Sequence, residues 1–361
     1  MIGKTETKVH SARQMQAQRW QALAQDRCAL GGGAVYAQIF IGLALYLYDH
    51  VSTPGYISVL LTIPFALPLL LLALKTAPAM RHGKATAFLF ALLHLFNAQL
   101  IFISLSAILM DTMPDHSLWT MALLVAAALA WANSGRREDA LARLTHFAKW
   151  LILILLGYAL VTALPHGNAS YFFPVLGHGW KTIGKGALWM CGAVSCCVWP
   201  LLTPQNSQTL SPMLEKKTTA ILPVILSILA GCVTMLVSAW LMPVYAMARS
   251  ETLGWRLMLA INMTPSIPAW SMEVLGVLLL FFLALSYHVT QAAALLCPGK
   301  DEPSGWLLLL LLLILVPCAA CPFPDIIKAL AQIALYRGPV TLAVMLMLYA
   351  VSVFRKKGAA P

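Results

Sequence analysis

Charged residues are scarce in this chain of 361 residues. They make up 10% of it, while 60% of its residues are hydrophobic, against about 25% charged and about 45–50% apolar residues in an average soluble domain. Acidic residues are the scarcest class, because only 13 positions are Asp or Glu. This composition excludes an ordinary water-soluble domain and predicts an integral membrane protein.

Motifs of soluble chemistry are also missing. The sequence contains no GxSxG elbow, no HExxH motif and no paired carboxylates within an apolar run, and the segment GHGWKT lacks the spacing of a phosphate-binding loop. The net charge of +11 is not gathered into the basic, aromatic-rich runs that bind nucleic acid. We therefore predict no enzymatic activity, no cofactor, no metal site and no nucleic-acid partner.

Ten apolar runs follow one another along the chain, each close to the roughly 20 residues that cross a bilayer core. They predict an N-terminal cytoplasmic or interfacial segment over residues 1–30, a ten-helix transmembrane domain over 31–354 and a cytoplasmic tail over 355–361. The predicted spans are residues 31–49, 56–76, 85–110, 118–134, 146–165, 186–206, 218–245, 268–296, 305–323 and 334–354.

The basic residues favour one orientation in the membrane. Counted by alternate loops, 18 of the 24 Lys and Arg residues lie on one side. Cytoplasmic loops retain positive charge, so both termini are predicted to face the cytoplasm. The six residues assigned to the external side are Lys181, Lys185, Arg249, Arg256, Lys328 and Arg337.

Two histidines fall inside apolar spans, where polar groups are costly unless they meet a partner or a cavity. His94 in span three and His288 in span eight each lie about 12 to 14 Å from the predicted cytoplasmic surface, at 1.5 Å per residue. They are therefore expected to meet if the two spans are neighbours, with Asn97 one turn beyond His94 and Gln291 one turn from His288. Such a cluster would either bind a ligand or hold the bundle together through interhelical hydrogen bonds.

Spans one and six both carry residues that can interrupt a helix. Span one opens with Gly31, Gly32 and Gly33, and span six contains Gly192 and Ser195 ahead of two prolines. Spans one and six are the first spans of two halves of five spans each. Because five is an odd number, the second half has the opposite orientation in the membrane. The predicted fold class is thus an all-α, 5+5 inverted-repeat (LeuT-like) bundle with broken helices one and six.

Short motifs resemble the B subunits of spore germinant receptors, the GerAB-type members of the amino acid/polyamine/organocation transporter superfamily. The similarity in topology covers nearly the whole chain after residue 30. The motifs are Gly55–Leu61 (GYISVLL), Tyr171–Gly177 (YFFPVLG) followed by Gly179, Ile183 and Lys185–Gly186, then Pro200, and the pair Met272–Glu273.

This resemblance implies a small germinant, such as an amino acid, bound at the centre of the bundle. It also implies partner subunits, namely an A-type membrane subunit and a C-type lipoprotein, a location in the cell membrane or spore inner membrane, and an external cap formed by Thr252–Trp270. The implied ligand-binding residues are Gly31, Gly32, Gly33, His94, Asn97, Gly192, Ser195 and His288.

Two other functions stay open from the sequence. The first is an amino-acid permease of the same superfamily, which would move its ligand rather than sense it. The second is a membrane enzyme in which His94 or His288 acts as a general base on a lipid-like substrate. The lack of a carboxylate or second catalytic group at that depth disfavours the enzyme.

Overall fold

The described part of the protein is helical. The computed structural model describes residues 28–42, 56–76, 84–112, 150–154, 179–202, 217–241, 270–296 and 323–358, with isolated positions between 18 and 25 and between 144 and 170. The predicted spans 118–134 and 305–323 and the predicted cap Thr252–Trp270 lie outside these residues, apart from the terminal Trp270 and Phe323.

The helices coincide with seven of the predicted spans. Gly179, which has a positive φ of 92°, directly precedes the helix of span six. The helices are Cys28–Gly42, α3 (Tyr56–Leu60), α4 (Ile63–Thr76), α5 (Lys84–Thr112), α8 (Trp180–Leu202), α10 (Lys217–Leu241), α13 (Trp270–Leu296) and α15 (Phe323–Gly358).

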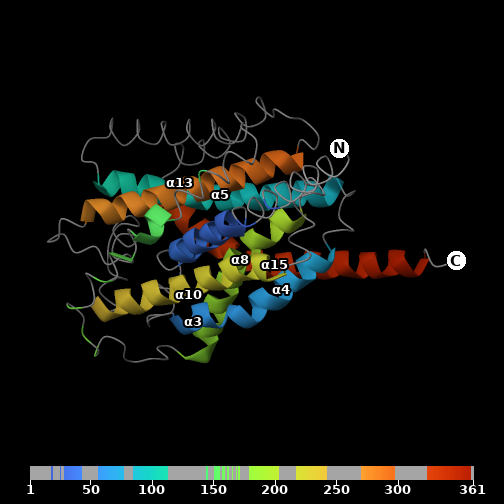
Figure 1. Ribbon diagram of the computed structural model, residues 1–361, viewed down its shortest axis with the longest axis horizontal. Coiled ribbons are helices and arrows are strands. Elements are labelled where there is room, and N and C mark those ends of the chain that lie inside the picture. The colour runs from blue at the N-terminus through green and yellow to red at the C-terminus, as the bar shows by residue number, and fades with distance from the viewer. Residues whose placement is uncertain are drawn as a thin grey trace, which may run out of the picture.

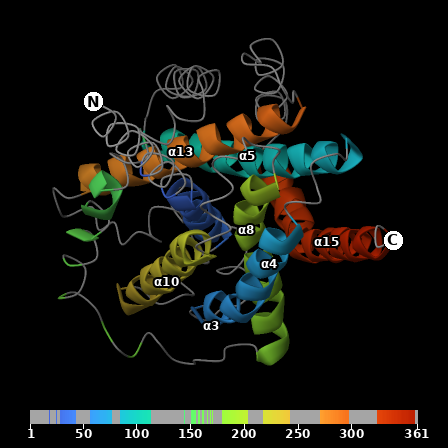
Figure 2. The ribbon, with the colours of Figure 1, turned by 45° about the vertical axis from the view of Figure 1, so that its right-hand side comes forward.

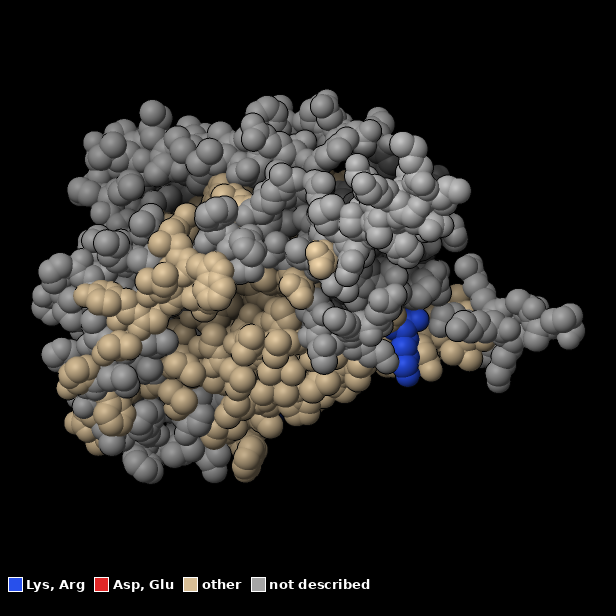
Figure 3. Space-filling model, in the orientation of Figure 1, with Lys and Arg blue, Asp and Glu red and all other residues tan. Residues whose placement is uncertain are grey.

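Four stretches within the described helices are long and apolar enough to cross a membrane: Ile57–Thr76, Ala87–Leu105, Gly276–Ala293 and Gln332–Val351. Their outward faces are apolar, because large hydrophobic side chains such as Phe65 and Met347 are 55% and 67% exposed. In the view of Figure 3 the described surface (tan) is uncharged, apart from Lys or Arg atoms at one edge. An apolar exterior of this kind fits a lipid environment, and the chain is an integral membrane protein.

The helices pack as two connected groups around the helix Cys28–Gly42. Helices α5 and α13 lie side by side along their lengths, and α8 packs against α15, α4 and α3 (Figures 1 and 2). Most of the central stretch Gly276–Ala293 of α13 is buried, as expected for a helix that is apolar on all sides. The C-terminal part of α15 projects from the body (Figure 1).

Glycines permit close approach where the helix Cys28–Gly42 meets its neighbours. A Cβ atom on Gly42 would lie 2.2 Å from the Trp189 ring of α8, and one on Gly231 of α10 would lie 2.7 Å from Ile39. No side chain larger than hydrogen fits at either contact without movement. These contacts fix the helix Cys28–Gly42 between α8 and α10.

Three described helices differ clearly from the sequence prediction, and one of them, α8, begins at Trp180 rather than at residue 186. Span two is divided by a turn at Leu61 and Thr62, because Pro64 lacks the backbone N–H that would bond to the carbonyl of Leu60 in a continuous helix. Helix α15 begins at Phe323 rather than at residue 334. Its first turn contains Pro324, which is tolerated there because the first N–H groups of a helix have no intrahelical partner.

Candidate functional site

Arg337 lies in the interior of the helix bundle, and its assignment to an external loop is corrected by the structure. Its side chain is only 3% exposed, and it sits near the middle of the 36-residue helix α15. It belongs to a buried stripe along that helix, spaced three or four residues apart: Leu330, Ala334, Arg337, Thr341 and Met345. A stripe with this spacing faces the core, and Arg337 therefore projects inward.

The guanidinium of Arg337 joins three helices through hydrogen bonds. Its Nη1 donates to Oε1 of Gln38 at 2.9 Å and also to Oδ1 of Asn97 in α5. Its Nε donates to the carbonyl of Ala334, one turn earlier in α15, at 3.3 Å. Gln38 in turn donates from Nε2 to the carbonyl of Asn97 at 3.1 Å. We call Gln38, Asn97 and Arg337 the arginine cluster.

Aromatic rings cover the same guanidinium. The Cζ atom of Arg337 lies 4.7 Å from the ring centroid of Trp189 and 5.7 Å from that of Phe96. The negative face of an aromatic ring attracts a cation, and this attraction is worth about 2 kcal/mol or more where water is excluded. Because Trp189 is fully buried, its ring orients the charge as well as stabilising it.

His94 and His288 meet as the sequence predicts. The two Nδ1 atoms are 2.9 Å apart and both side chains are fully buried. The contact joins α5 to α13, so these helices are neighbours with the two histidines at the same depth. We call His94 and His288 the histidine pair.

Several buried polar atoms near these groups have no hydrogen-bond partner among the described residues. They include Nε2 of both histidines, Nδ2 of Asn97 and Oε1 of Gln291. A buried polar atom without a partner costs about 1–3 kcal/mol, and such atoms cluster where a ligand, an ion or water completes the set. Asn97 and the histidine pair therefore have capacity to bind something further.

Gly192 and Gly338 form the contact at which α15 crosses α8. A Cβ atom on Gly192 would lie 3.0 Å from Cβ of Arg337, and one on Gly338 would lie 3.0 Å from the backbone nitrogen of Gly192. Small residues allow two helix backbones to approach closely. Gly192 thus acts on the arginine cluster by letting the backbone of Arg337 come near α8.

The residues expected to interrupt spans one and six lie within continuous helix. The helix Cys28–Gly42 runs through Gly31, Gly32 and Gly33, and α8 runs through Gly192 and Ser195. The hydroxyl of Ser195 donates to the carbonyl of Gly192 three residues earlier, so the local hydrogen bonding stays within the helix. At these five residues the backbone is not open to a ligand. The remaining residues of both predicted spans, 43–49 and 203–206, lie outside the described residues.

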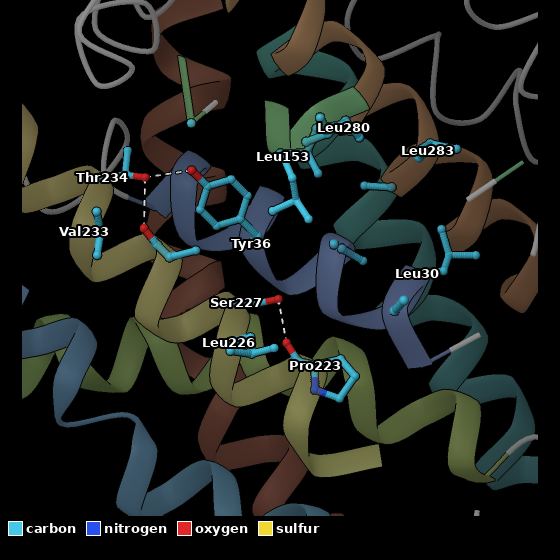
Figure 4. A pocket seen from close by; sticks show the side chains of 17 residues that line it. Leu30, Tyr36, Leu153, Pro223, Leu226, Ser227, Val233, Thr234, Leu280 and Leu283 are labelled. Carbon is cyan, nitrogen blue, oxygen red and sulfur yellow. Dashed lines mark hydrogen bonds between the residues drawn. The ribbon is translucent and has the colours of Figure 1, made fainter. Parts of the chain in front are cut away.

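A separate apolar cavity of about 450 Å³ lies between the helix Cys28–Gly42, α10, α13 and the residues Ile152, Leu153 and Gly157. Gly33 lines it, and its wall is mostly aliphatic (Figure 4). The polar groups there bond to each other: Tyr36 and Thr234 share a 2.7 Å hydrogen bond, and Ser227 donates to the carbonyl of Pro223 at 2.8 Å. This cavity suits an apolar occupant rather than a polar solute.

Sequence reasoning found three residues of these two clusters and missed Gln38 and Arg337, and it also missed Trp189, whose ring covers the guanidinium. Gln38 and Arg337 each stand alone in an apolar run, which is the usual signal of a functional polar residue in a membrane helix. For Arg337 this signal was available four residues inside the predicted span 334–354. Trp189 gives no comparable signal, because an aromatic residue in a membrane helix is ordinary.

Metal-binding groups are sparse in the described part of the chain. No set of three or more His, Cys, Asp or Glu side chains comes together there in a way that would hold a metal ion. The histidine pair alone supplies two ligands, fewer than the three or four protein ligands that a transition-metal site needs.

Three solved structures with a similar fold are those of one transporter. A manganese transporter from Eremococcus coleocola, in complex with an aromatic bis-isothiourea substituted compound, aligns with a TM-score of 0.60 and 10% identity, over 92% of this chain and 79% of that chain. Two single-substitution mutants of the same transporter align with TM-scores of 0.60 and 0.59, at 11% and 10% identity. At this identity the likeness shows the fold alone, and the protein shares the fold of that transporter.

Comparisons of the sequence itself give no match. No family model matches the chain, and no curated protein matches it.

Proposed function

We propose that this protein is a permease for a small solute that carries a carboxylate, such as an amino acid, and that the arginine cluster binds that carboxylate. The observation that carries the proposal is the position of Arg337, held by Gln38 and Asn97 in the interior of a transporter fold. A buried guanidinium is costly in a membrane protein and typically marks a substrate pathway. No chemical conversion of the solute is involved.

A carboxylate fits the donors of this cluster. Guanidinium and amide N–H groups bind carboxylate oxygens, and the guanidinium does so with two parallel hydrogen bonds where geometry allows. The Nδ2 atom of Asn97 is a donor without a partner among the described residues. Arg337 and Asn97 together therefore offer N–H groups from two helices to one anion.

A divalent cation such as manganese fits the same cluster poorly. The guanidinium repels a cation, and Mn²⁺ prefers carboxylate, carbonyl and imidazole ligands arranged in an octahedron. The described residues bring no such set together. Sharing a fold with a manganese transporter therefore does not by itself imply that this protein carries the same solute.

Transport by the purified full-length chain tests the proposal. Liposomes containing the protein and loaded with unlabelled amino acids are expected to take up a mixture of the twenty standard amino acids in ¹⁴C-labelled form by counterflow. Arg337→Gln is expected to abolish the counterflow, and Tyr336→Phe, at a neighbouring side chain that is 65% exposed, is the matched control. Absence of counterflow in the wild type, or its persistence in Arg337→Gln, would contradict the proposal.

The germinant-receptor function rests on the short motifs of the sequence, and under it the protein would act beside A-type and C-type subunits. A pure receptor binds its ligand without turnover. Thermal stabilisation of the purified protein by an amino acid, together with no counterflow, would favour the receptor, because a ligand that binds only the folded state raises its stability.

A further inference from the structure

The histidine pair has a geometry that limits how many protons it can hold. A distance of 2.9 Å between the two Nδ1 atoms requires one Nδ1 to carry a hydrogen and the other to accept it through a lone pair. If both rings were doubly protonated, both Nδ1 atoms would carry hydrogens and the contact would be repulsive. The pair therefore exists with the contact intact in two forms only, one neutral and one with a single added proton.

The place for the added proton is an Nε2 atom. In the neutral form, the ring that donates from Nδ1 has a bare Nε2, and the ring that accepts carries its hydrogen on Nε2. Protonation of the bare Nε2 gives an imidazolium that still donates to its neighbour. Both Nε2 atoms are buried and have no hydrogen-bond partner among the described residues, so neither position is blocked by an existing bond.

Two titratable or charged groups of the described residues face the pair. The ring of Tyr287 in α13 lies edge-on to both histidines, with centroids 6.0 Å from His94 and 5.2 Å from His288. Arg337 in α15 acts on His288 through its charge. Of these two groups only the guanidinium carries a permanent charge, so it is the charge to which the pair responds.

The pair and the arginine cluster are one helical turn apart. His94 and Asn97 are three residues apart in α5, a spacing that places their Cβ atoms about 5–6 Å apart on one face. Asn97 accepts a hydrogen bond from Arg337. A change of charge at either cluster therefore changes the electrostatic energy of a charge at the other, because the path between them is short and has a low dielectric constant.

From these relations we propose that His94 and His288 form a shared binding site for one proton, and that the proton enters this site together with the solute's carboxylate. This rests on the proposed function. The carboxylate offsets the positive charge of Arg337, which otherwise opposes a second positive charge one turn away. The proton comes from bulk water and leaves with the solute on the other side, so each solute carries one proton across the membrane.

The transport arm compares proton-driven accumulation with exchange. Liposomes with an inward proton gradient are expected to accumulate the ¹⁴C-amino-acid mixture several-fold above equilibrium, and a protonophore should collapse this accumulation. Each variant's accumulation above equilibrium is divided by its own counterflow, which corrects for the amount of active protein. We expect His94→Gln and His288→Gln to lower this ratio to zero, with Leu153→Ala, which changes an exposed apolar side chain, as the control. An unchanged ratio in the histidine variants, or no effect of the gradient on the wild type, overturns coupling through the pair.

A second arm needs no solute. The chain has nine histidines, and the difference between ¹⁵N-histidine spectra of the wild type and His94→Gln in bilayers isolates the pair. We expect a coupling between the two Nδ1 nuclei that survives the uptake of a single proton on acidification. A pair that shows no coupling, stays neutral, or loses the coupling on its first protonation overturns the shared site.

The two arms separate failure of the proton site from failure of the proposed function. If the wild type shows no counterflow, the proposed function fails, and coupling to a carboxylate fails with it. The spectra still decide whether the histidines share a proton. A pair that merely holds α5 against α13 would give the Nδ1 coupling without proton uptake.

Discussion

Arg337 donates a hydrogen bond to the side-chain oxygen of Asn97, which precedes it by 240 residues in the sequence. The bond connects α15 to α5 at a point where Gln38 also contributes. Asn97 lies near the middle of the candidate membrane span Ala87–Leu105. Three helices far apart in the sequence therefore converge on one cation in the interior of the bundle.

Replacing Arg337 by methionine is expected to lower stability by about 1–3 kcal/mol for each buried acceptor that loses its donor. Methionine keeps much of the side-chain volume but leaves Oε1 of Gln38 and Oδ1 of Asn97 without the guanidinium. Thermal unfolding of the purified protein in detergent measures the effect. Tyr336→Phe should unfold at the wild-type temperature, and an equally stable Arg337→Met would contradict a structural role for the cluster.

Changing Asn97 to aspartate is expected to move stability and binding in opposite directions. A carboxylate beside the guanidinium forms a buried ion pair with short, charge-assisted hydrogen bonds, so the unfolding temperature should stay level or rise. The same carboxylate competes with that of the solute and should weaken its binding at least tenfold. Counterflow and unfolding measured on one preparation test both effects, and wild-type counterflow in Asn97→Asp would contradict anion binding at Arg337.

Adjacent glycines in the helix Cys28–Gly42 should respond differently to alanine. A Cβ atom on Gly32 would lie 2.9 Å from the carbonyl oxygen of Pro223, whereas one on Gly33 would meet only Leu280, at 3.8 Å. Gly32→Ala therefore forces α10 away and is expected to cost about 1–3 kcal/mol. Gly33→Ala should be neutral or stabilising, because alanine favours helix by up to about 1 kcal/mol. Unfolding temperatures of the two variants give the comparison, and equal values would contradict this packing.

Gly192 and Gly184 provide a matched pair within α8. A Cβ atom on Gly192 would press on Arg337, while one on Gly184 meets nothing within 4 Å. Gly192→Ala should displace Arg337 and reduce counterflow, and Gly184→Ala should leave it unchanged while adding helix propensity. A Gly192→Ala protein with full counterflow would show that the close approach of α15 is not needed for solute binding.

Local sequence patterns were sufficient for the parts of the site that depend on position along one helix. The equal depths of His94 and His288 follow from residue counts within two apolar runs, and the 2.9 Å contact between them confirms that the two histidines lie at the same level. The bounds of α5 and α13 likewise fall within two residues of the predicted spans. Such predictions succeed because hydrophobic length and rise per residue are properties of a single helix.

The sequence by itself determined that the protein is a bundle of membrane helices with polar residues at matching depths. The tertiary structure alone decided that Arg337 belongs to the interior, because its surroundings come from α5, α8 and the helix Cys28–Gly42. It also decided that Gly192 serves close packing rather than a break, since the role of a glycine depends on what lies opposite its missing Cβ. A helix fixes the direction of a side chain relative to its own axis, and only the packing of helices fixes what that side chain meets.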